Sequence, residues 1–112
     1  MSDFISIIVT VFNEEENVAP LTHAIREAMK GFNYEIVFVD DGSTDSTLVN
    51  ILKAQRDDLV IVEFSKNFGQ SLALMAGIHH SRGNILVTLD GDLQNDPSDI
   101  PLLVENLNSC HC

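Results

Sequence analysis

The sequence predicts one α/β domain, built on a parallel sheet of about four strands in the order 3-2-1-4 with helices on both faces. The apolar runs are short, continuous and rich in Ile and Val, which is typical of strands buried on both faces. They alternate with segments of helical spacing, and right-handed crossovers between such strands give the order. A chain of 112 residues suffices for one domain with one core.

Four runs are expected to form the strands, and no apolar run is long enough to cross a membrane. The predicted strands are Phe4–Val11, Tyr34–Val39, Leu59–Phe64 and Ile85–Leu89.

The first helix is expected from its apolar stripe, which runs from Val18 to Met29. Asn17 is its expected N-cap, and Gly31 is the signal that ends it. The second helix is expected over about Thr44–Arg56. Its residues expected to point inward are Leu48, Ile51 and Leu52.

The third helix is expected over about Gln70–Ser81. It carries small residues that allow close approach to the sheet, namely Ala73, Ala76 and Gly77. A fourth helix is expected to begin near Ser98, directly after Pro97.

The charge balance is strongly acidic, with six Lys and Arg against seventeen Asp and Glu and a net charge of −11. This excludes a surface that tracks the phosphates of a nucleic acid. It also argues against docking of this stretch on anionic lipid by itself. The composition is that of a cytoplasmic-type globular chain, without an N-terminal targeting segment.

Polar residues follow directly on three of the predicted strands. They form the clusters Asn13–Glu16, Asp40–Ser43 and Asp90–Asp92. Ligands of open α/β sheets bind outside the carboxyl ends of the strands, where the strand order reverses. The reversal falls between strands 1 and 4, so the sequence predicts a ligand site at this edge.

Asp90 and Asp92 are two residues apart, so in extended backbone their side chains point to the same side. Two close carboxylates favour a hard divalent cation between them, and Mg²⁺ or Mn²⁺ commonly also holds substrate phosphates. Gln94 could add a carbonyl ligand. The alternative interpretation is a polar turn, which is the commoner meaning of an isolated Asp-Gly-Asp.

The other two clusters have structural and functional interpretations. Ser43, Thr44 and Asp45 are interpreted as a turn and helix cap. This interpretation leaves the consecutive aspartates Asp40 and Asp41 unexplained. One of them could accept hydrogen bonds from a base or ribose. Glu15 and Glu16 are interpreted as a solvated face.

Two further residues near this edge have open interpretations. Phe12 could stack on a planar base or belong to the core. Lys66 follows the third strand and could contact a phosphate.

Four motifs, in order and at matching spacing, resemble the family 2 inverting glycosyltransferases. They are Ile7–Glu16 (IIVTVFNEEE), Val39–Asp45 (VDDGSTD), Asn67–Gly77 (NFGQSLALMAG) and Thr88–Pro97 (TLDGDLQNDP). The resemblance covers nearly all of residues 6 to 107. The most similar branch is the polyprenyl-phosphate glycosyltransferases, which include dolichol-phosphate mannose synthases and bacterial undecaprenyl-phosphate sugar transferases.

The resemblance implies a Rossmann-like GT-A fold and assigns roles to individual positions. Residues that match the nucleotide pocket are Thr10, Phe12 and Glu14, with Asp41 meeting the base, Asp40 beside it and Phe12 standing where Tyr is more usual. The stretch Asn67–Gln70 resembles the branch that acts on lipid phosphates. Lys66, from its position, Gln70 and Asp90 are also expected to bind the nucleotide. Residues that match the metal and diphosphate motif are Asp90, Asp92 and Gln94, with Mg²⁺ or Mn²⁺ as the cofactor.

The implied reaction is inverting transfer of a sugar from a UDP- or GDP-sugar to a polyprenyl phosphate, at the cytoplasmic face of a membrane. The family's domain continues beyond the metal motif, through acceptor-binding strands and an acidic residue proposed as base. Residues 1–112 are therefore expected to be one nucleotide-sugar-binding domain that is incomplete at its C-terminus. This portion is expected not to transfer sugar alone, and to form a homodimer through the exposed fourth strand.

Other classes remain as alternatives. A sugar-1-phosphate nucleotidyltransferase would need a Gly-rich basic loop after the first strand, where Asn13–Glu16 is acidic. A phospho-receiver domain would carry its acidic pair after the first strand, whereas here the pair follows the second. A dinucleotide oxidoreductase would carry G-x-G-x-x-G there. A fragment that binds nucleotide or metal without turnover is the last alternative.

Overall fold

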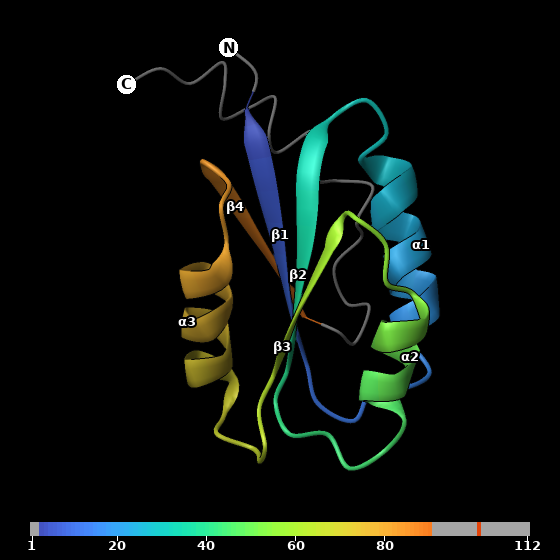
Figure 1. Cartoon of the computed structure of the whole chain (residues 1–112), viewed down its shortest axis with the longest axis vertical. Coiled ribbons are helices and arrows are strands. Elements are labelled where there is room, and N and C mark those ends of the chain that lie inside the picture. Colours follow the sequence, from blue (N-terminus) through green and yellow to red (C-terminus); the bar gives the residue numbers. More distant parts are fainter. Residues whose placement is uncertain (1–2, 91–100, 102–112) are drawn as a thin grey trace.

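The computed structural model of the chain describes residues 3–90 and residue 101, and its elements alternate between strand and helix (Figure 1). The elements are β1 (Phe4–Val11), α1 (Val18–Ala28), β2 (Asn33–Asp40), α2 (Thr47–Lys53), β3 (Leu59–Glu63), α3 (Gln70–His80) and β4 (Ile85–Asp90). The strands pair in parallel in the order β3-β2-β1-β4, which confirms the predicted order. The fourth predicted helix lies outside the described residues.

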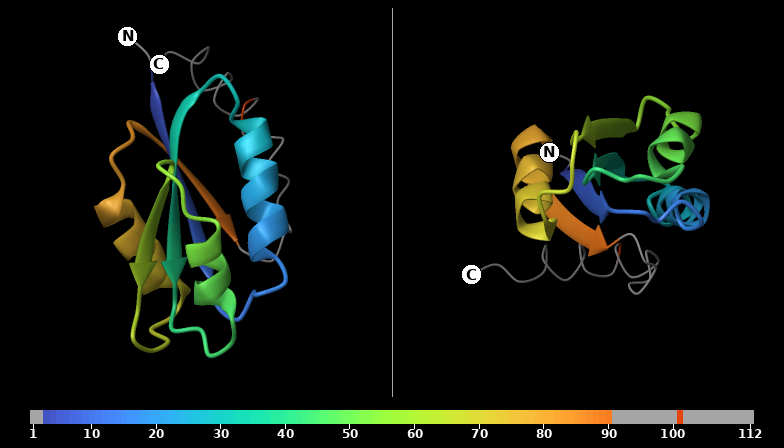
Figure 2. Two further views of the ribbon diagram at one scale, coloured as in Figure 1. Left: turned by 45° about the vertical axis from the view of Figure 1, so that its right-hand side comes forward. Right: turned by 90° about the horizontal axis from the view of Figure 1, so that it is seen from below.

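Helices cover both faces of the sheet, as predicted. Figure 2 shows α1 and α2 on one face and α3 on the other. The larger core cluster lies under α1 and α2, where Ile25 and Ile51 pack with Phe38 of β2. The smaller cluster lies under α3 and joins Ala73 to Ile8 of β1. Successive residues of β1 and β2 are fully buried, which explains the continuous apolar runs.

Helix α1 begins after Asn17, but its side chain does not cap the helix. The Asn17 amide instead donates to Oε2 of Glu14 at 2.8 Å. The predicted boundary is therefore confirmed, and the expected side-chain cap is wrong. Gly31 lies beyond the helix end with φ +87°, which is a conformation suited to glycine.

Helix α2 is shorter than predicted, because it begins at Thr47 and not near Thr44. The Asp45 carboxylate accepts hydrogen bonds from the backbone N–H and the hydroxyl of Thr47, which holds the preceding residues in a turn. Ile51 is buried as predicted, whereas Leu52 is 51% exposed, so its predicted inward orientation is wrong.

Helix α3 lies very close to the sheet at Gly77, as its small residues predicted. A Cβ atom at Gly77 would lie 2.4 Å from Cγ2 of Ile8 and 3.1 Å from Cγ2 of Val39. Ala73 is fully buried one turn earlier. Any larger side chain at Gly77 would push α3 away from β1 and β2.

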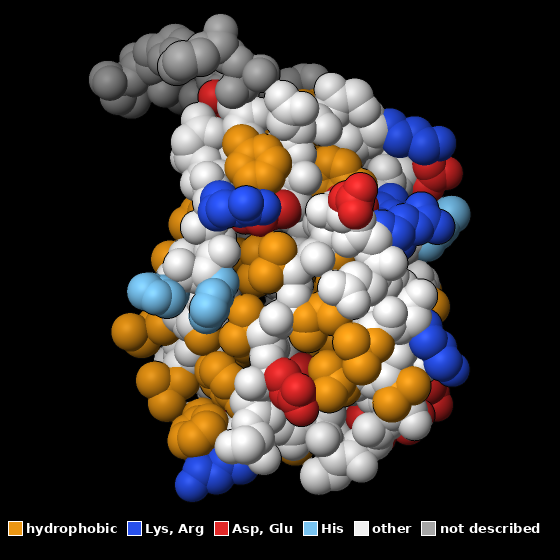
Figure 3. All heavy atoms as spheres, in the orientation of Figure 1, with side chains coloured by type: hydrophobic (Ala, Val, Ile, Leu, Met, Phe, Trp, Pro, Cys, Tyr) orange, Lys and Arg blue, Asp and Glu red, His pale blue; other side chains and the backbone are white. Residues whose placement is uncertain are grey.

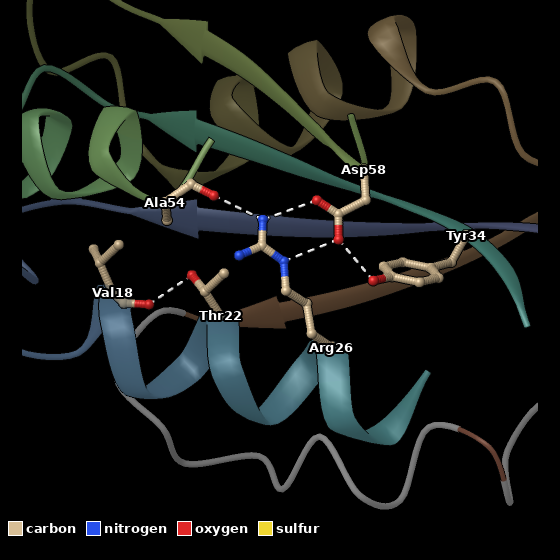
Figure 4. Close-up of polar contacts among 6 residues, drawn as sticks. All are labelled: Val18, Thr22, Arg26, Tyr34, Ala54 and Asp58. Atoms are coloured by element: carbon tan, nitrogen blue, oxygen red, sulfur yellow. Dashed lines mark hydrogen bonds and ion pairs between the residues drawn. The ribbon is translucent and has the colours of Figure 1, made fainter. Parts of the chain in front are cut away.

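A polar clamp ties α1 to the segment before β3 (Figure 4). The Arg26 guanidinium donates from Nε and Nη2 to the two oxygens of Asp58, at 2.9 and 2.8 Å, and from Nη2 to the Ala54 carbonyl at 2.7 Å. The Tyr34 hydroxyl donates to Oδ2 of Asp58 at 2.6 Å. Burial raises the pKa of Asp58, but the hydrogen bonds from Arg26 and Tyr34 outweigh it and hold that pKa below the usual range.

The clamp gives a testable pH dependence through Tyr34, the one tyrosine in a chain without tryptophan. Burial, followed by the hydrogen bond to Asp58, raises the pKa of Tyr34 from 10.0 to about 12. Because the folded pKa is the higher one, the stabilisation is complete below the unfolded pKa and is lost as the pH rises from 10 through about 12. A phenolate absorbance titration should therefore show a midpoint of about 12.

Asp58→Asn should lower that midpoint, while the neighbouring exposed Asp57→Asn should leave it unchanged. A midpoint near 10.0 in the unsubstituted chain would contradict the clamp.

Candidate functional site

The carboxyl ends of the strands lie level with one another at one edge of the sheet. Thr10 of β1 lies in register with Asp90 of β4, and Val11 lies in register with Asp40 of β2. Asp40 in turn lies in register with Glu63 of β3. The backbone therefore brings the ends of all the strands together, as the sequence predicted for this edge.

The loops after β1 and β2 are joined by Asn13, which has the left-handed φ of +53°. Its backbone N–H donates to Oγ of Ser43 at 2.9 Å, and its Oδ1 accepts from the backbone N–H of Thr44 at 2.8 Å. Ser43 or Thr44 was expected to cap the second helix, and that expectation is wrong because α2 begins only at Thr47 and both residues bind Asn13. The Glu14 N–H also donates to Oγ1 of Thr47 at 2.8 Å.

Asn13 was expected in the polar cluster at this edge, but its role in joining the two loops was not predicted, although asparagine tolerates the left-handed region better than most residues. Its position directly after a buried strand was the available signal.

The loops after β2 and β3 are joined by Asp41 and Gly42. Oδ1 of Asp41 accepts from the Phe68 N–H at 2.8 Å. Oδ2 accepts from the Gly69 N–H and from the Asn67 amide, each at 3.1 Å. Gly42 has φ +73°, and a Cβ there would lie 2.2 Å from the Lys66 carbonyl carbon. The loop after β2 is therefore in direct contact with the loops after β1 and β3.

Asp40, the last residue of β2, and Asp41, which follows it, are both buried, at 2% and 5% exposure. Oδ1 of Asp40 accepts from the Ser43 N–H at 3.2 Å. Asp41 holds the turn at residues 67–69. A carboxylate offers about four acceptor positions, so a further N–H donor can still bind Asp41.

The remaining predicted nucleotide-pocket residues lie around these loops. Thr10 and Glu14 are half-buried, and Gln70 is the exposed first residue of α3. Phe12 is 42% exposed, so its interpretation as a core residue is wrong. Lys66 is exposed, with Nζ 5.2 Å from the centroid of the Phe68 ring.

A shallow, open hollow of about 280 Å³ lies beside the end of β1. Its lining residues are Asn13, Glu14, Glu15, Glu16, Asn17 and Asp45. Glu15 and Glu16 are exposed, as expected for a solvated face. Burial raises the pKa of Asp45, but hydrogen bonds from Thr47 outweigh it and lower the pKa. A phosphate near this hollow would meet several negative charges, which favours a cation as intermediary.

The predicted metal ligands lie at or beyond the end of β4. Asp90 ends that strand beside Thr10, whereas Asp92 and Gln94 lie outside the described residues. Within the described part of the chain, no three His, Cys, Asp or Glu side chains gather in a way that could hold a metal ion. Carboxylate and carbonyl oxygens are the donors that Mg²⁺ and Mn²⁺ prefer, so the predicted donor set fits such an ion. The other two predicted ligands of this metal site, Asp92 and Gln94, follow Asp90 in the sequence.

Comparison with known proteins relates this edge to a family. The family model described as "Glycosyl transferase family 2" matches residues 6–111. A dodecaprenyl-phosphate galacturonate synthase of Rhizobium johnstonii is 49% identical over 108 residues, which cover 92% of this chain and 32% of that protein. An undecaprenyl-phosphate 4-deoxy-4-formamido-L-arabinose transferase of Shewanella sediminis is 43% identical, with coverage of 91% and 32%. The chain thus spans about a third of the length of these relatives.

Solved structures share the fold. The mannosyltransferase PcManGT of Pyrobaculum calidifontis, in complex with GDP-Man and Mn²⁺, superposes with a TM-score of 0.76 at 26% identity. That alignment covers 88% of this chain and 30% of the other. Glucosyl-3-phosphoglycerate synthase of Mycobacterium tuberculosis, in complex with UDP, superposes with a TM-score of 0.82 at 26% identity, with coverage of 97% and 41%.

These similarities confirm the expected GT-A fold. The matched residues include the loops that Asn13, Asp41 and Gly42 hold together and the end of β4. The chain belongs to glycosyl transferase family 2.

Proposed function

We propose that this chain is the nucleotide-sugar-binding part of an inverting glycosyltransferase that transfers a sugar from a UDP- or GDP-sugar to a polyprenyl phosphate. One observation carries the proposal. The edge of the sheet that contains Asp41 and the end of β4 belongs to a chain that is 49% identical to a dodecaprenyl-phosphate galacturonate synthase.

The base is proposed to bind between the loops after β1 and β2. Asp41 accepts an N–H of the base beside its bonds to the turn, and Asp40, Thr10 and Glu14 line the pocket. Phe12 offers its exposed ring for stacking, because 42% of the residue is open to solvent. Hydrogen bonds link the loop after β2 to the loops after β1 and β3, which supports a pocket formed by these loops.

The diphosphate is proposed to bind at the end of β4 through Mg²⁺ or Mn²⁺. Asp90, Asp92 and Gln94 would hold the ion, which supplies Lewis-acid stabilisation of the leaving diphosphate when bound. Lys66 and Gln70 lie after β3 and at the start of α3, where they can contact phosphate oxygens. The acidic hollow beside β1 supports a need for the cation.

A polyprenyl phosphate is proposed as the acceptor for two reasons, the nucleophilicity of a phosphate and the names of the two relatives. A phosphate oxyanion is already a good nucleophile, so the chain needs only modest general-base assistance at this step. Both relatives described above are named for polyprenyl phosphates, one dodecaprenyl and one undecaprenyl.

The proposal is tested by calorimetric titration of the chain with UDP, GDP and ADP in Mn²⁺. We expect UDP or GDP to bind more tightly than ADP. Phe12→Ala should weaken that binding by about 10-fold, because stacking on an aromatic ring contributes about 1–3 kcal/mol. Val49→Ala, at a residue of 50% exposure on α2, is the matched control and should leave the affinity unchanged. Binding of neither UDP nor GDP would contradict the proposal.

A further inference from the structure

The outer face of α3 and the turn before it are apolar and open to solvent. Phe68 is 47%, Leu72 48%, Met75 64% and Ile78 43% exposed. The opposite side of the helix packs on the sheet through Ala73 and Gly77. Figure 3 shows hydrophobic side chains gathered over α3 at the left of the molecule. The helix is therefore apolar on the face that the sheet covers and also on the outer face.

Charge around this surface differs from that of the rest of the chain. Residues 64–89 contain no Asp or Glu, so all seventeen carboxylates lie elsewhere. Lys66 precedes the helix, and His79, His80 and Arg82 lie at and beyond its C-terminal end. Figure 3 shows Lys, Arg and His side chains around the apolar group. The outer face of α3 is thus an apolar surface with a basic rim.

We infer that this face docks on the surface of a lipid bilayer that contains anionic lipid. Apolar side chains of an interfacial helix enter the headgroup boundary, and basic residues beside them meet the lipid phosphates. The inference rests on the proposed function, because a polyprenyl phosphate is a lipid that resides in a bilayer.

A second copy of the chain fits this face less well. In a symmetric pair of α3 helices the basic rims of both copies would face each other, and residues 64–89 offer no carboxylate to pair with them. An anionic lipid surface supplies the complementary charge instead.

The position of α3 relative to the candidate site supports this orientation. Helix α3 begins at Gln70, directly after the turn that Asp41 holds through Phe68 and Gly69. A bilayer in contact with the outer face of α3 therefore lies beside the edge where the strands end. A lipid phosphate at headgroup depth can then approach that edge beside Lys66.

The net charge of −11 does not oppose this docking as strongly as the total suggests. Salt screens exposed charges over about 8 Å at physiological ionic strength. Residues 64–89 contain no carboxylate, and Glu35, whose carboxylate lies 3.6 Å from the Arg82 guanidinium, is only 3% exposed, whereas the acidic hollow is lined by the loop before α1 and by Asp45. The net charge of the whole chain therefore does not describe this face, on which Lys66 and Arg82 are exposed.

The test is flotation of the chain with vesicles of phosphatidylcholine and phosphatidylglycerol, at physiological salt. We expect the unsubstituted chain to float with the vesicles. The double variant L72S/M75S should reduce the floating fraction by about fivefold or more, since it removes the most exposed apolar side chains of the face. The matched control is V49S/L52S, which changes residues of 50% and 51% exposure on α2 at the opposite face, and should float as the unsubstituted chain does.

Three results would overturn the inference. They are an unsubstituted chain that does not float, a control that loses flotation as much as L72S/M75S, and a dimer without vesicles that L72S/M75S dissociates. Nucleotide binding in Mn²⁺ is measured on the same proteins and separates the two claims. Binding without flotation contradicts the docking alone, whereas flotation without binding contradicts the proposed function.

Discussion

Gly42→Ala is expected to destabilise the protein by on the order of 2–4 kcal/mol and to disrupt the candidate site. Gly42 has φ +73°, and a Cβ there would lie 2.2 Å from the Lys66 carbonyl carbon and 2.4 Å from the Asn67 nitrogen. Both contacts are with backbone, so no flexible side chain can move aside. The loop after β2 must then separate from the loop after β3. Urea unfolding measures the loss of stability, and nucleotide titration measures the loss of the site.

Gly31→Ala is the matched control for Gly42→Ala. Gly31 has a similar φ of +87°, but nothing lies within 4 Å of its Cβ position. Its substitution carries the backbone strain alone and should cost about 1–2 kcal/mol. If both variants lost the same stability, the close contact between the two loops would be contradicted.

Asp92→Asn is expected to weaken Mn²⁺-supported nucleoside diphosphate binding by about 10-fold or more. The substitution keeps the shape of the side chain and removes one charge from the pair with Asp90. A lost charge-assisted ligand is worth about 1.5–3 kcal/mol. Without metal, thermal stability should stay level or rise, because repulsion between the two carboxylates is relieved.

Asp57→Asn is the control for Asp92→Asn, because Asp57 is an exposed carboxylate that precedes β3 and lies away from the ends of the strands where the site is. It should change neither nucleotide binding nor stability. If Asp92→Asn kept full affinity and lost stability, Asp90 and Asp92 would belong to a polar turn and not to a metal site.

The sheet and its coverage could be predicted because each depends on a pattern of many residues. A buried parallel strand needs apolar side chains on both faces, so runs such as Phe4–Val11 have one interpretation. The close approach of α3 could be predicted because Ala73 and Gly77 leave room for the sheet, and both lie against it. The strand order could be predicted because strands and helices alternate along the chain, and the crossover from one parallel strand to the next is right-handed.

The loop contacts could not be predicted, because they join residues far apart in the sequence. The Asn13 bonds to Ser43 and Thr44 span about thirty residues, and local capping rules favoured both as caps of α2. The sequence could not decide whether Phe12 lies in the core or at the surface, because a single aromatic residue after a strand shows no periodic pattern that would indicate its face.

A buried carboxylate inside β2 escaped prediction for the same reason. Glu35 is 3% exposed and accepts from the Ser6 hydroxyl at 2.6 Å and the Arg82 N–H at 2.7 Å. Its partners lie on β1 and after α3, so no local sequence pattern predicts these hydrogen bonds.

The central claim is that the edge of the sheet binds a nucleoside diphosphate through a divalent cation. Calorimetric titration of this chain with UDP and GDP, once in Mn²⁺ and once in excess chelator, tests it most directly. We expect at least one of the two nucleotides to bind in Mn²⁺ and its affinity to fall by about 10-fold or more in chelator. Equal affinity under both conditions, or binding of neither nucleotide in Mn²⁺, would contradict it.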